Sequence, residues 1–149
     1  MTDLDDPCLA CRIVAGEART AGGVVLRADG FTVHALAGPA PIAGWLVVTS
    51  DRHARAVYDL EDDEAAALGR LAARVMRAQR SALGAEHVYA FAIGDALLHA
   101  HLHLVPRYAG TPARLRGRGA FDFAATEVLG EEELRAAAER VGAALASAG

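Results

Sequence analysis

The chain has 149 residues, of which 15 are basic and 19 acidic, and its formal net charge is −4. That length suits one domain over residues 1–149, with a core at about 8–108 and a tail and helix at 109–149. Hydrophobic residues make up 53% of the chain, which excludes wholesale disorder. Mild acidity without a basic tail argues against nucleic-acid partners.

Composition also excludes several locations and chemistries. The longest apolar runs, such as Trp45–Val48, are too short to span a bilayer, and Met1–Pro7 lacks the apolar region of a signal peptide. We therefore expect a cytoplasmic protein without a membrane partner. The chain has no lysine, so a P-loop lysine and a Schiff-base lysine are impossible. None of its three serines lies in a Gly-x-Ser-x-Gly elbow.

The first half of the chain predicts a short entry segment and three strands. The entry segment is Cys8–Glu17, for which we expect a single helical turn. The turn Ala28-Asp29-Gly30 joins the first two strands, and a Gly-Pro-rich loop precedes the third. The predicted strands are Val24–Arg27, Phe31–Leu36 and Trp45–Thr49.

The main helix is predicted at Glu61–Leu83. Its apolar residues recur with helical spacing and form one stripe: Leu68, Leu71, Ala72, Val75 and Met76. Four acidic residues occupy its first turn, where they match the helix dipole, and Gly84 ends it.

The second half predicts two more strands and a final helix. Val88–Ile93 and Ala96–Val105 are the strands, with Gly94-Asp95 as a two-residue hairpin turn between them. A final amphipathic helix is expected near Glu131–Ala146. Hairpin-linked strands with few helices predict an α+β fold, a five-stranded antiparallel sheet with two main helices on one face. A sheet edge can remain free for a partner chain.

Three histidines at alternate positions are the most informative feature. In a strand, His99, His101 and His103 project from one face, and the intervening apolar residues project toward the core. One interpretation is a solvated polar face of an edge strand. A second is a zinc-dependent hydrolase that uses the three imidazoles as ligands.

The third interpretation is nucleophilic catalysis. A neutral imidazole is a competent nucleophile near pH 7, and attack on phosphorus gives a phosphohistidine that water can hydrolyse. The neighbouring imidazoles can then donate hydrogen bonds to the phosphate oxygens.

The segment His99-Ala100-His101-Leu102-His103-Leu104-Val105-Pro106-Arg107 resembles the signature of the histidine triad (HIT) superfamily of nucleotide hydrolases and transferases. Cys8-Leu9-Ala10-Cys11-Arg12-Ile13-Val14-Ala15-Gly16-Glu17 is similar to the opening of many bacterial members. A third similar segment is Gly44–Val48, followed by His53 and Leu60. The resemblance covers Cys8 to Tyr108, in order.

This resemblance implies a homodimer that acts on nucleoside phosphoramidates or dinucleoside polyphosphates through a covalent nucleotidyl-His101 intermediate. It implies that His103 contacts the phosphate and assists the leaving group, and that His99 orients the site. It places substrate-binding residues at Ile13, Trp45, Gly94 and Asp95. Trp45 either stacks on a base or fills the core, and Asp95 either pairs with a triad histidine or is a plain turn residue.

The chain also departs from the family pattern. Ala37 stands where members usually carry an acidic residue that binds ribose hydroxyls, and a tight turn replaces the usual phosphate-binding loop. A non-catalytic nucleotide-binding module is therefore an alternative function.

The two cysteines, Cys8 and Cys11, form a Cys-x-x-Cys pair, which in a cytoplasmic chain indicates zinc or redox chemistry before a structural disulfide. Thioredoxin-like surroundings are absent, and tetrahedral zinc needs two further ligands. The family resemblance implies His53 and His99 as those ligands, at a structural zinc site. The alternative is a pair of small buried thiols.

Overall fold

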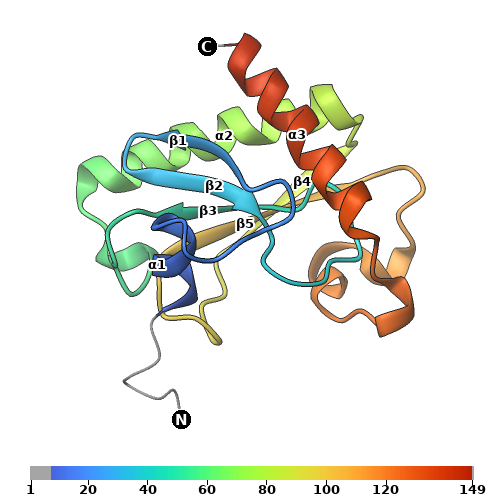
Figure 1. The fold of residues 1–149 in the computed structure, drawn as a ribbon, viewed down its shortest axis with the longest axis horizontal. Coiled ribbons are helices and arrows are strands. Elements are labelled where there is room, and N and C mark those ends of the chain that lie inside the picture. Colours follow the sequence, from blue (N-terminus) through green and yellow to red (C-terminus); the bar gives the residue numbers. More distant parts are fainter. Residues whose placement is uncertain (1–7, 149) are drawn as a thin grey trace.

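The computed structural model describes residues 8–148, and the expectation for Met1–Pro7 lies outside that range. In the described part, helix α1 spans Leu9–Val14, α2 spans Asp62–Leu83 and α3 spans Glu131–Ser147 (Figure 1). The strands are β1 Val24–Ala28, β2 Phe31–Ala35, β3 Leu46–Ser50, β4 His87–Phe91 and β5 His101–Arg107. No helix in residues 8–148 is long and apolar enough to cross a bilayer.

The five strands form one antiparallel sheet in the order β1-β2-β3-β5-β4. Helices α2 and α3 pack against each other, and α2 contacts β4 and β5 whereas α3 contacts β1 and β2. Both helices therefore cover the same face of the sheet (Figure 1). The predicted α+β class, the strand number and the one-sided helix packing are confirmed.

The core between this face and the helices is built from alternate strand residues. Val33, Val48 and Leu104 are fully buried there, together with Leu71 and Val75 of α2. The predicted apolar stripe of α2 is thus confirmed, with Met76 packed partly buried at its margin. Glu61 and Glu64 form a capping box at the start of α2, and Gly84 ends the helix with a φ of 72°.

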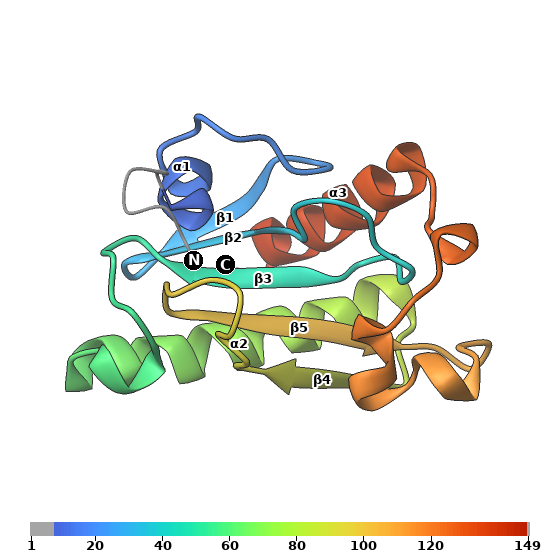
Figure 2. The same ribbon diagram turned by 90° about the horizontal axis from the view of Figure 1, so that it is seen from below.

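The opposite face of the sheet faces α1 and the loops rather than the long helices (Figure 2). The strand register lines up residues of that face in two rows. One row runs from Phe91 through His103 and Val47 to His34. The neighbouring row places His101 beside Thr49 and Thr32. Directly paired residues share a face, so the sheet carries a polar, histidine-rich surface opposite the helices.

The sequence prediction is wrong at the start of the fifth strand. β5 begins at His101 rather than Ala96, and the segment 92–100 is a loop, so Gly94-Asp95 is not a two-residue hairpin turn. The backbone N–H of Ala100 donates to the Ala54 carbonyl at 2.7 Å, and Ser50 N–H donates to the Ala100 carbonyl at 3.0 Å. These bonds tie the end of the loop to the last residue of β3 and to the segment after it, instead of continuing the ladder to β4.

β5 also continues through Pro106, where the sequence predicted its end. The pairs between β3 and β5 run only from Thr49↔His101 to Leu46↔Leu104. Pro106 lies beyond the last of these pairs and is opposite Val88 of β4 alone. The missing N–H of proline therefore costs no hydrogen bond to β3.

Candidate functional site

His101 lies on β5 with its imidazole oriented by the backbone. Its Nδ1 is 2.5 Å from the carbonyl oxygen of His99. A carbonyl oxygen can only accept, so Nδ1 carries the proton and donates it to this bond. The neutral ring then has an unprotonated Nε2, and its lone pair is available to attack an electrophile.

His103 has the opposite tautomer. The indole Nε1–H of Trp45 donates to His103 Nδ1 at 3.0 Å, so the proton of the neutral ring lies on Nε2. Burial lowers the pKa of His103 to about 4, and the neighbouring charges of His101 and His34 add to the shift. His103 is therefore a neutral hydrogen-bond donor at pH 7, with its ring centroid 5.0 Å from that of His101.

The structure adds His34, to which the sequence gave no role. It is buried on β2, where its Nδ1–H donates to the Ala35 carbonyl and its Nε2 accepts from the Thr49 hydroxyl, each at 2.8 Å. Burial lowers its pKa, as does the nearby His101, although the bond to Ala35 opposes the shift. The strand register could have found His34, because it stands across Val47 from His103.

A pocket of about 480 Å³ lies against this face of the sheet. His101 and His103 line it, and so do all four expected substrate-binding residues: Ile13, Trp45, Gly94 and Asp95. Trp45 is only 3% exposed and packs in the smaller apolar core on this side of the sheet, so it both fills that core and lines the pocket. Asp95 is exposed, in the loop before β5.

One wall of the pocket comes from two aromatic residues of the tail that the sequence did not associate with the site. Phe121 packs edge-to-face against Trp45 and His103, with ring centroids 4.9 and 5.2 Å away, and Phe123 also lines the pocket. Short 3₁₀ turns carry this segment. No local sequence pattern indicates such a long-range contact.

His99 does not line this pocket and instead joins a second group of side chains. Ligand atoms of Cys8, Cys11, His53 and His99 all lie within 4.8 Å of one another. Cys11 Sγ is 3.1 Å from His53 Nδ1 and 3.5 Å from His99 Nδ1, and the two Nδ1 atoms are 3.1 Å apart. Within residues 8–148, the three triad histidines do not form such a cluster.

The donor set of this cluster fits a tetrahedral zinc ion. Zinc bonds of about 2.3 Å to sulfur and 2.0–2.1 Å to nitrogen place ligand atoms about 3.3 to 3.8 Å apart. His99 Nε2–H donates to the Ser50 carbonyl at 2.7 Å, which leaves Nδ1 unprotonated and turned toward the two thiols. Burial and the adjacent Cys8 raise the pKa of the Cys11 thiol, so its thiolate needs a cation beside it.

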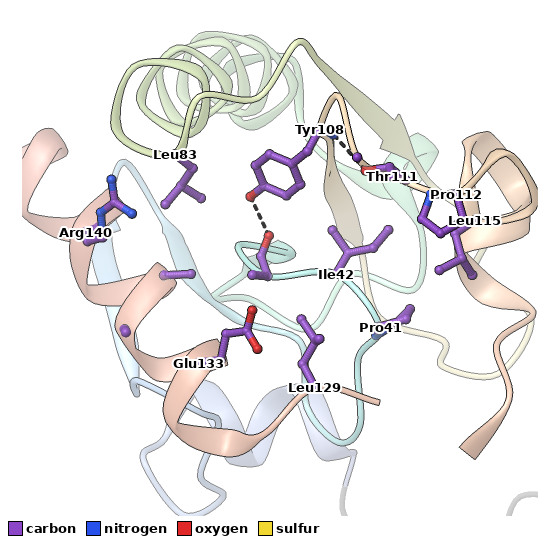
Figure 3. Close-up of a pocket in the computed structure, with 14 residues that line it drawn as sticks. Pro41, Ile42, Leu83, Tyr108, Thr111, Pro112, Leu115, Leu129, Glu133 and Arg140 are labelled. Atoms are coloured by element: carbon purple, nitrogen blue, oxygen red, sulfur yellow. Dashed lines mark hydrogen bonds between the residues drawn. The ribbon is translucent and has the colours of Figure 1, made fainter. Parts of the chain in front are cut away.

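A further cavity, of about 470 Å³, is remote from this chemistry. It lies between α3, the end of α2 and the loops at residues 41–43 and 108–115 (Figure 3). The Tyr108 hydroxyl donates to the Ala43 carbonyl there at 2.7 Å, and burial raises the pKa of Tyr108 to about 12. No histidine or cysteine of the described chain lines this cavity, so the triad pocket is the candidate active site.

Comparison with known proteins identifies the fold. No protein-family model matches the sequence, and no curated protein matches it. Among solved structures, a HIT-like protein from Bartonella henselae aligns over 94% of this chain and 97% of its own, with a TM-score of 0.73 and 16% identity. A hypothetical histidine triad nucleotide-binding protein from Sulfolobus tokodaii aligns over 94% and 93%, with a TM-score of 0.74 and 18% identity.

A zinc-bound histidine triad family protein from Mycobacterium smegmatis is similar over 96% of this chain and 98% of its own. Its TM-score is 0.71 and its identity to this chain is 23%. The described chain combines this architecture with a His-x-His-x-His segment that leads into β5 and a Cys-x-x-Cys pair at α1. By its structure, therefore, this chain has the fold of the histidine triad proteins.

Proposed function

We propose that this chain is a nucleotide hydrolase or nucleotidyl transferase that acts through a covalent nucleotidyl-His101 intermediate. The observation that carries the proposal is the hydrogen bond from His101 Nδ1–H to the His99 carbonyl. That bond leaves the Nε2 lone pair free at the pocket, and it stabilises the positive charge that the ring acquires when Nε2 forms a bond.

In the proposed reaction, His101 Nε2 attacks the α-phosphorus and forms a P–N bond. The bond from phosphorus to the leaving group breaks, and the leaving group departs with the electron pair. Neutral His103 donates its Nε2–H to a phosphate oxygen or to the leaving atom, which stabilises charge in the transition state. Water then attacks phosphorus and releases a proton to solvent, the P–N bond breaks, and the electron pair returns to Nε2.

The substrate classes are nucleoside phosphoramidates and dinucleoside polyphosphates, and the charges of the pocket favour the first. Of the described residues that line the pocket, Asp95 is the one acidic side chain, and no arginine lines it. A polyphosphate carries several negative charges and would find no arginine there to pair with. A phosphoramidate carries a single negative charge at its phosphorus and needs less compensation.

The experiment is covalent trapping with adenosine 5′-phosphoramidate, quenched at alkaline pH and followed by mass spectrometry. We expect an adduct of one nucleoside monophosphate at His101. His101→Asn should abolish both adduct and turnover while ligand binding and fold remain intact. A normally active His101 variant beside an inactive His103→Asn variant would show that the nucleophile is assigned wrongly. Ligand binding without any adduct or turnover would favour the non-catalytic module.

We further propose a structural role for zinc at Cys8, Cys11, His53 and His99. Two thiolates and two imidazoles fill all four positions of a tetrahedral zinc, so no site is left for substrate or water. Such an ion would join α1 to the loop after β3 and to the residue that accepts the His101 hydrogen bond. We also propose that the chain acts as a cytoplasmic homodimer, without nucleic-acid or membrane partners.

A further inference from the structure

We propose that the triad pocket selects its substrate by an apolar ring on the phosphoryl group and does not read ribose hydroxyls. The inference rests on the proposed function in that the phosphate is placed at His101 and His103. It names the class of organic group that the pocket accepts: a planar, apolar ring, whether or not a sugar links it to phosphorus.

Most polar side chains of the pocket already have hydrogen-bond partners inside the protein. His34 uses both ring nitrogens, one on the Ala35 carbonyl and one on Thr49. The hydroxyl proton of Thr49 is used in the same bond, and the indole N–H of Trp45 is used by His103. The donors among these groups are all in use, so a sugar oxygen could accept a hydrogen bond from them only if an existing bond broke. The Thr49 oxygen can still accept, but Thr49 is only 1% exposed, which leaves almost none of it for a ligand.

Two kinds of polar side chain are then left for a ligand. The first kind is the Nε2 atoms of His101 and His103, which interact with the phosphate in the proposed reaction and are not available to a sugar. Asp95 can accept hydrogen bonds, but it is exposed to solvent at the pocket rim. A hydrogen bond at such a position replaces one to water and adds little selectivity.

The remaining walls are apolar. Ile13 of α1, Leu36 and Val47 line one part of the pocket, and Phe121 and Phe123 line another. Apart from Asp95, the rim has large apolar residues as well, because Leu9 and Ile93 line the pocket although they are 42% and 48% exposed. Large apolar side chains left exposed beside an apolar pocket indicate a surface that a ligand covers.

Aromatic and aliphatic walls of this kind favour a planar ring, since rings pack face-on or edge-on against them. A nucleobase satisfies this requirement, and so does a naphthalene ring that carries no sugar at all. The pocket would therefore bind ribonucleotides and 2′,3′-dideoxyribonucleotides alike.

The test measures binding of three monophosphates to the full chain by titration calorimetry: AMP, 2′,3′-dideoxy-AMP and 1-naphthyl phosphate. We expect the Kd values of the two nucleotides to agree within about 3-fold, and naphthyl phosphate to bind within about 10-fold of AMP. A loss of about 10-fold or more on removing the two hydroxyls would overturn the inference. So would a failure of naphthyl phosphate to bind, or of all three ligands to bind at millimolar concentration.

Three variants locate the effect. Phe123→Ala, which shortens the apolar wall, should weaken all three ligands by about 10-fold, whereas Tyr58→Ala, at a residue 87% exposed and outside the pocket, should change none. Asp95→Ala should leave the ratio of AMP to dideoxy-AMP affinity unchanged, and a selective loss of AMP binding would show that Asp95 reads the sugar. All three ligands are monophosphates whose binding is measured without turnover, so the result is independent of whether an adduct forms on His101.

Discussion

The indole N–H of Trp45 is bonded to Nδ1 of His103, at 3.0 Å, and this contact sets the protonation pattern of the candidate active site. Trp45 precedes β3, whereas His103 lies in the middle of β5, so the bond joins adjacent strands of the sheet. It leaves the single proton of the neutral His103 ring on Nε2. His101 carries its proton on Nδ1 instead, so one ring presents a lone pair and its neighbour presents a donor.

Trp45→Phe tests this arrangement, because it keeps an aromatic ring in the core and removes the N–H. Without the indole donor, His103 Nδ1 is left buried without a partner, and the ring gains access to the wrong tautomer. An unmade buried hydrogen bond costs about 1–3 kcal/mol, so we expect kcat to fall by about 10-fold or more. The measurement is steady-state kinetics, with the nitrogen chemical shifts of His103 as a direct report on its tautomer.

Phe121→Leu is the matched control for Trp45→Phe. Phe121 touches both Trp45 and His103 through its ring but makes no hydrogen bond to either. Its replacement should leave the His103 tautomer as it is. Equal kinetics for the wild-type chain and Trp45→Phe, with unchanged nitrogen shifts, would remove the indole from the mechanism.

Acid should destabilise the fold through His103. Its pKa lies near 4 in the folded chain and near 6.5 when unfolded, so between these values the unfolded state binds more protons. Stability therefore rises with pH across this window and is lost as pH falls from about 6.5 to about 4, by on the order of 1 to 3 kcal/mol. Burial lowers the pKa of His34 and His99 too, and both contribute with the same sign.

The difference between wild type and His103→Gln isolates this contribution, because the other histidines and the cysteine cluster are common to both chains. Denaturant unfolding at several pH values between 4 and 8 is the measurement. We expect the wild type to lose more stability than the variant on acidification. Parallel curves for the two chains would show that His103 is not buried as a neutral ring.

The sheet and the α2 helix were predictable from sequence because their signals are local. Alternation and helical spacing of apolar residues place Val48 and Val75 in the core whatever the rest of the chain does. The true start of β5 was not predictable, since it depends on bonds from Ala100 to Ala54 and Ser50, which are remote in sequence. The local pattern of residues 96–100 predicts a strand, and only the hydrogen bonds to these distant partners show that the segment is a loop.

The candidate site divides in the same way. The triad and the Cys-x-x-Cys pair are short motifs, so they could be found from sequence and a family resemblance. His34 and Phe121 carry no motif and reach the pocket through strand register and tail packing. The assumption that all three triad histidines share one strand face also failed, because His99 precedes β5 and turns toward the cysteines.

The free edge of β4 predicts self-association. β4 pairs with β5 on one side, and no other strand of the described chain covers its second side. We expect an isologous dimer in sedimentation velocity at micromolar concentration. Ala90→Lys puts a charge on this exposed edge, and a two-fold axis would bring the two charges close together, so the variant should dissociate more readily.

Thr126→Lys supplies the control for the dimer experiment, because it adds the same charge at an exposed position in the tail, outside β4. It should sediment as the wild type does. A monomer at micromolar concentration for the wild-type chain, or equal dissociation of both lysine variants, would contradict assembly through the β4 edge.

The cysteine–histidine cluster predicts one zinc ion per chain and a stability that depends on it. Zinc would bind the folded site, whose four ligand atoms lie within 4.8 Å of one another, so a chelator should lower Tm. Its affinity should fall as pH drops, because protons compete with the metal for the thiolates and imidazoles. Cys11→Ser should reduce zinc content and Tm, whereas His87→Ala, at an exposed histidine on β4, should alter neither.

The same variant tests how far the metal acts on catalysis. His99 belongs to the cluster, and its backbone carbonyl accepts the hydrogen bond from His101 Nδ1–H. Loss of the ion should therefore affect His101 only by shifting the position of that carbonyl. Cys11→Ser should therefore reduce Tm more than it reduces covalent labelling of His101. Metal analysis, thermal unfolding and adduct formation on one preparation supply the comparison. A zinc-free chain with unchanged Tm would leave Cys8 and Cys11 as ordinary thiols, and complete loss of labelling in a folded Cys11→Ser chain would make the cluster part of the catalytic machinery.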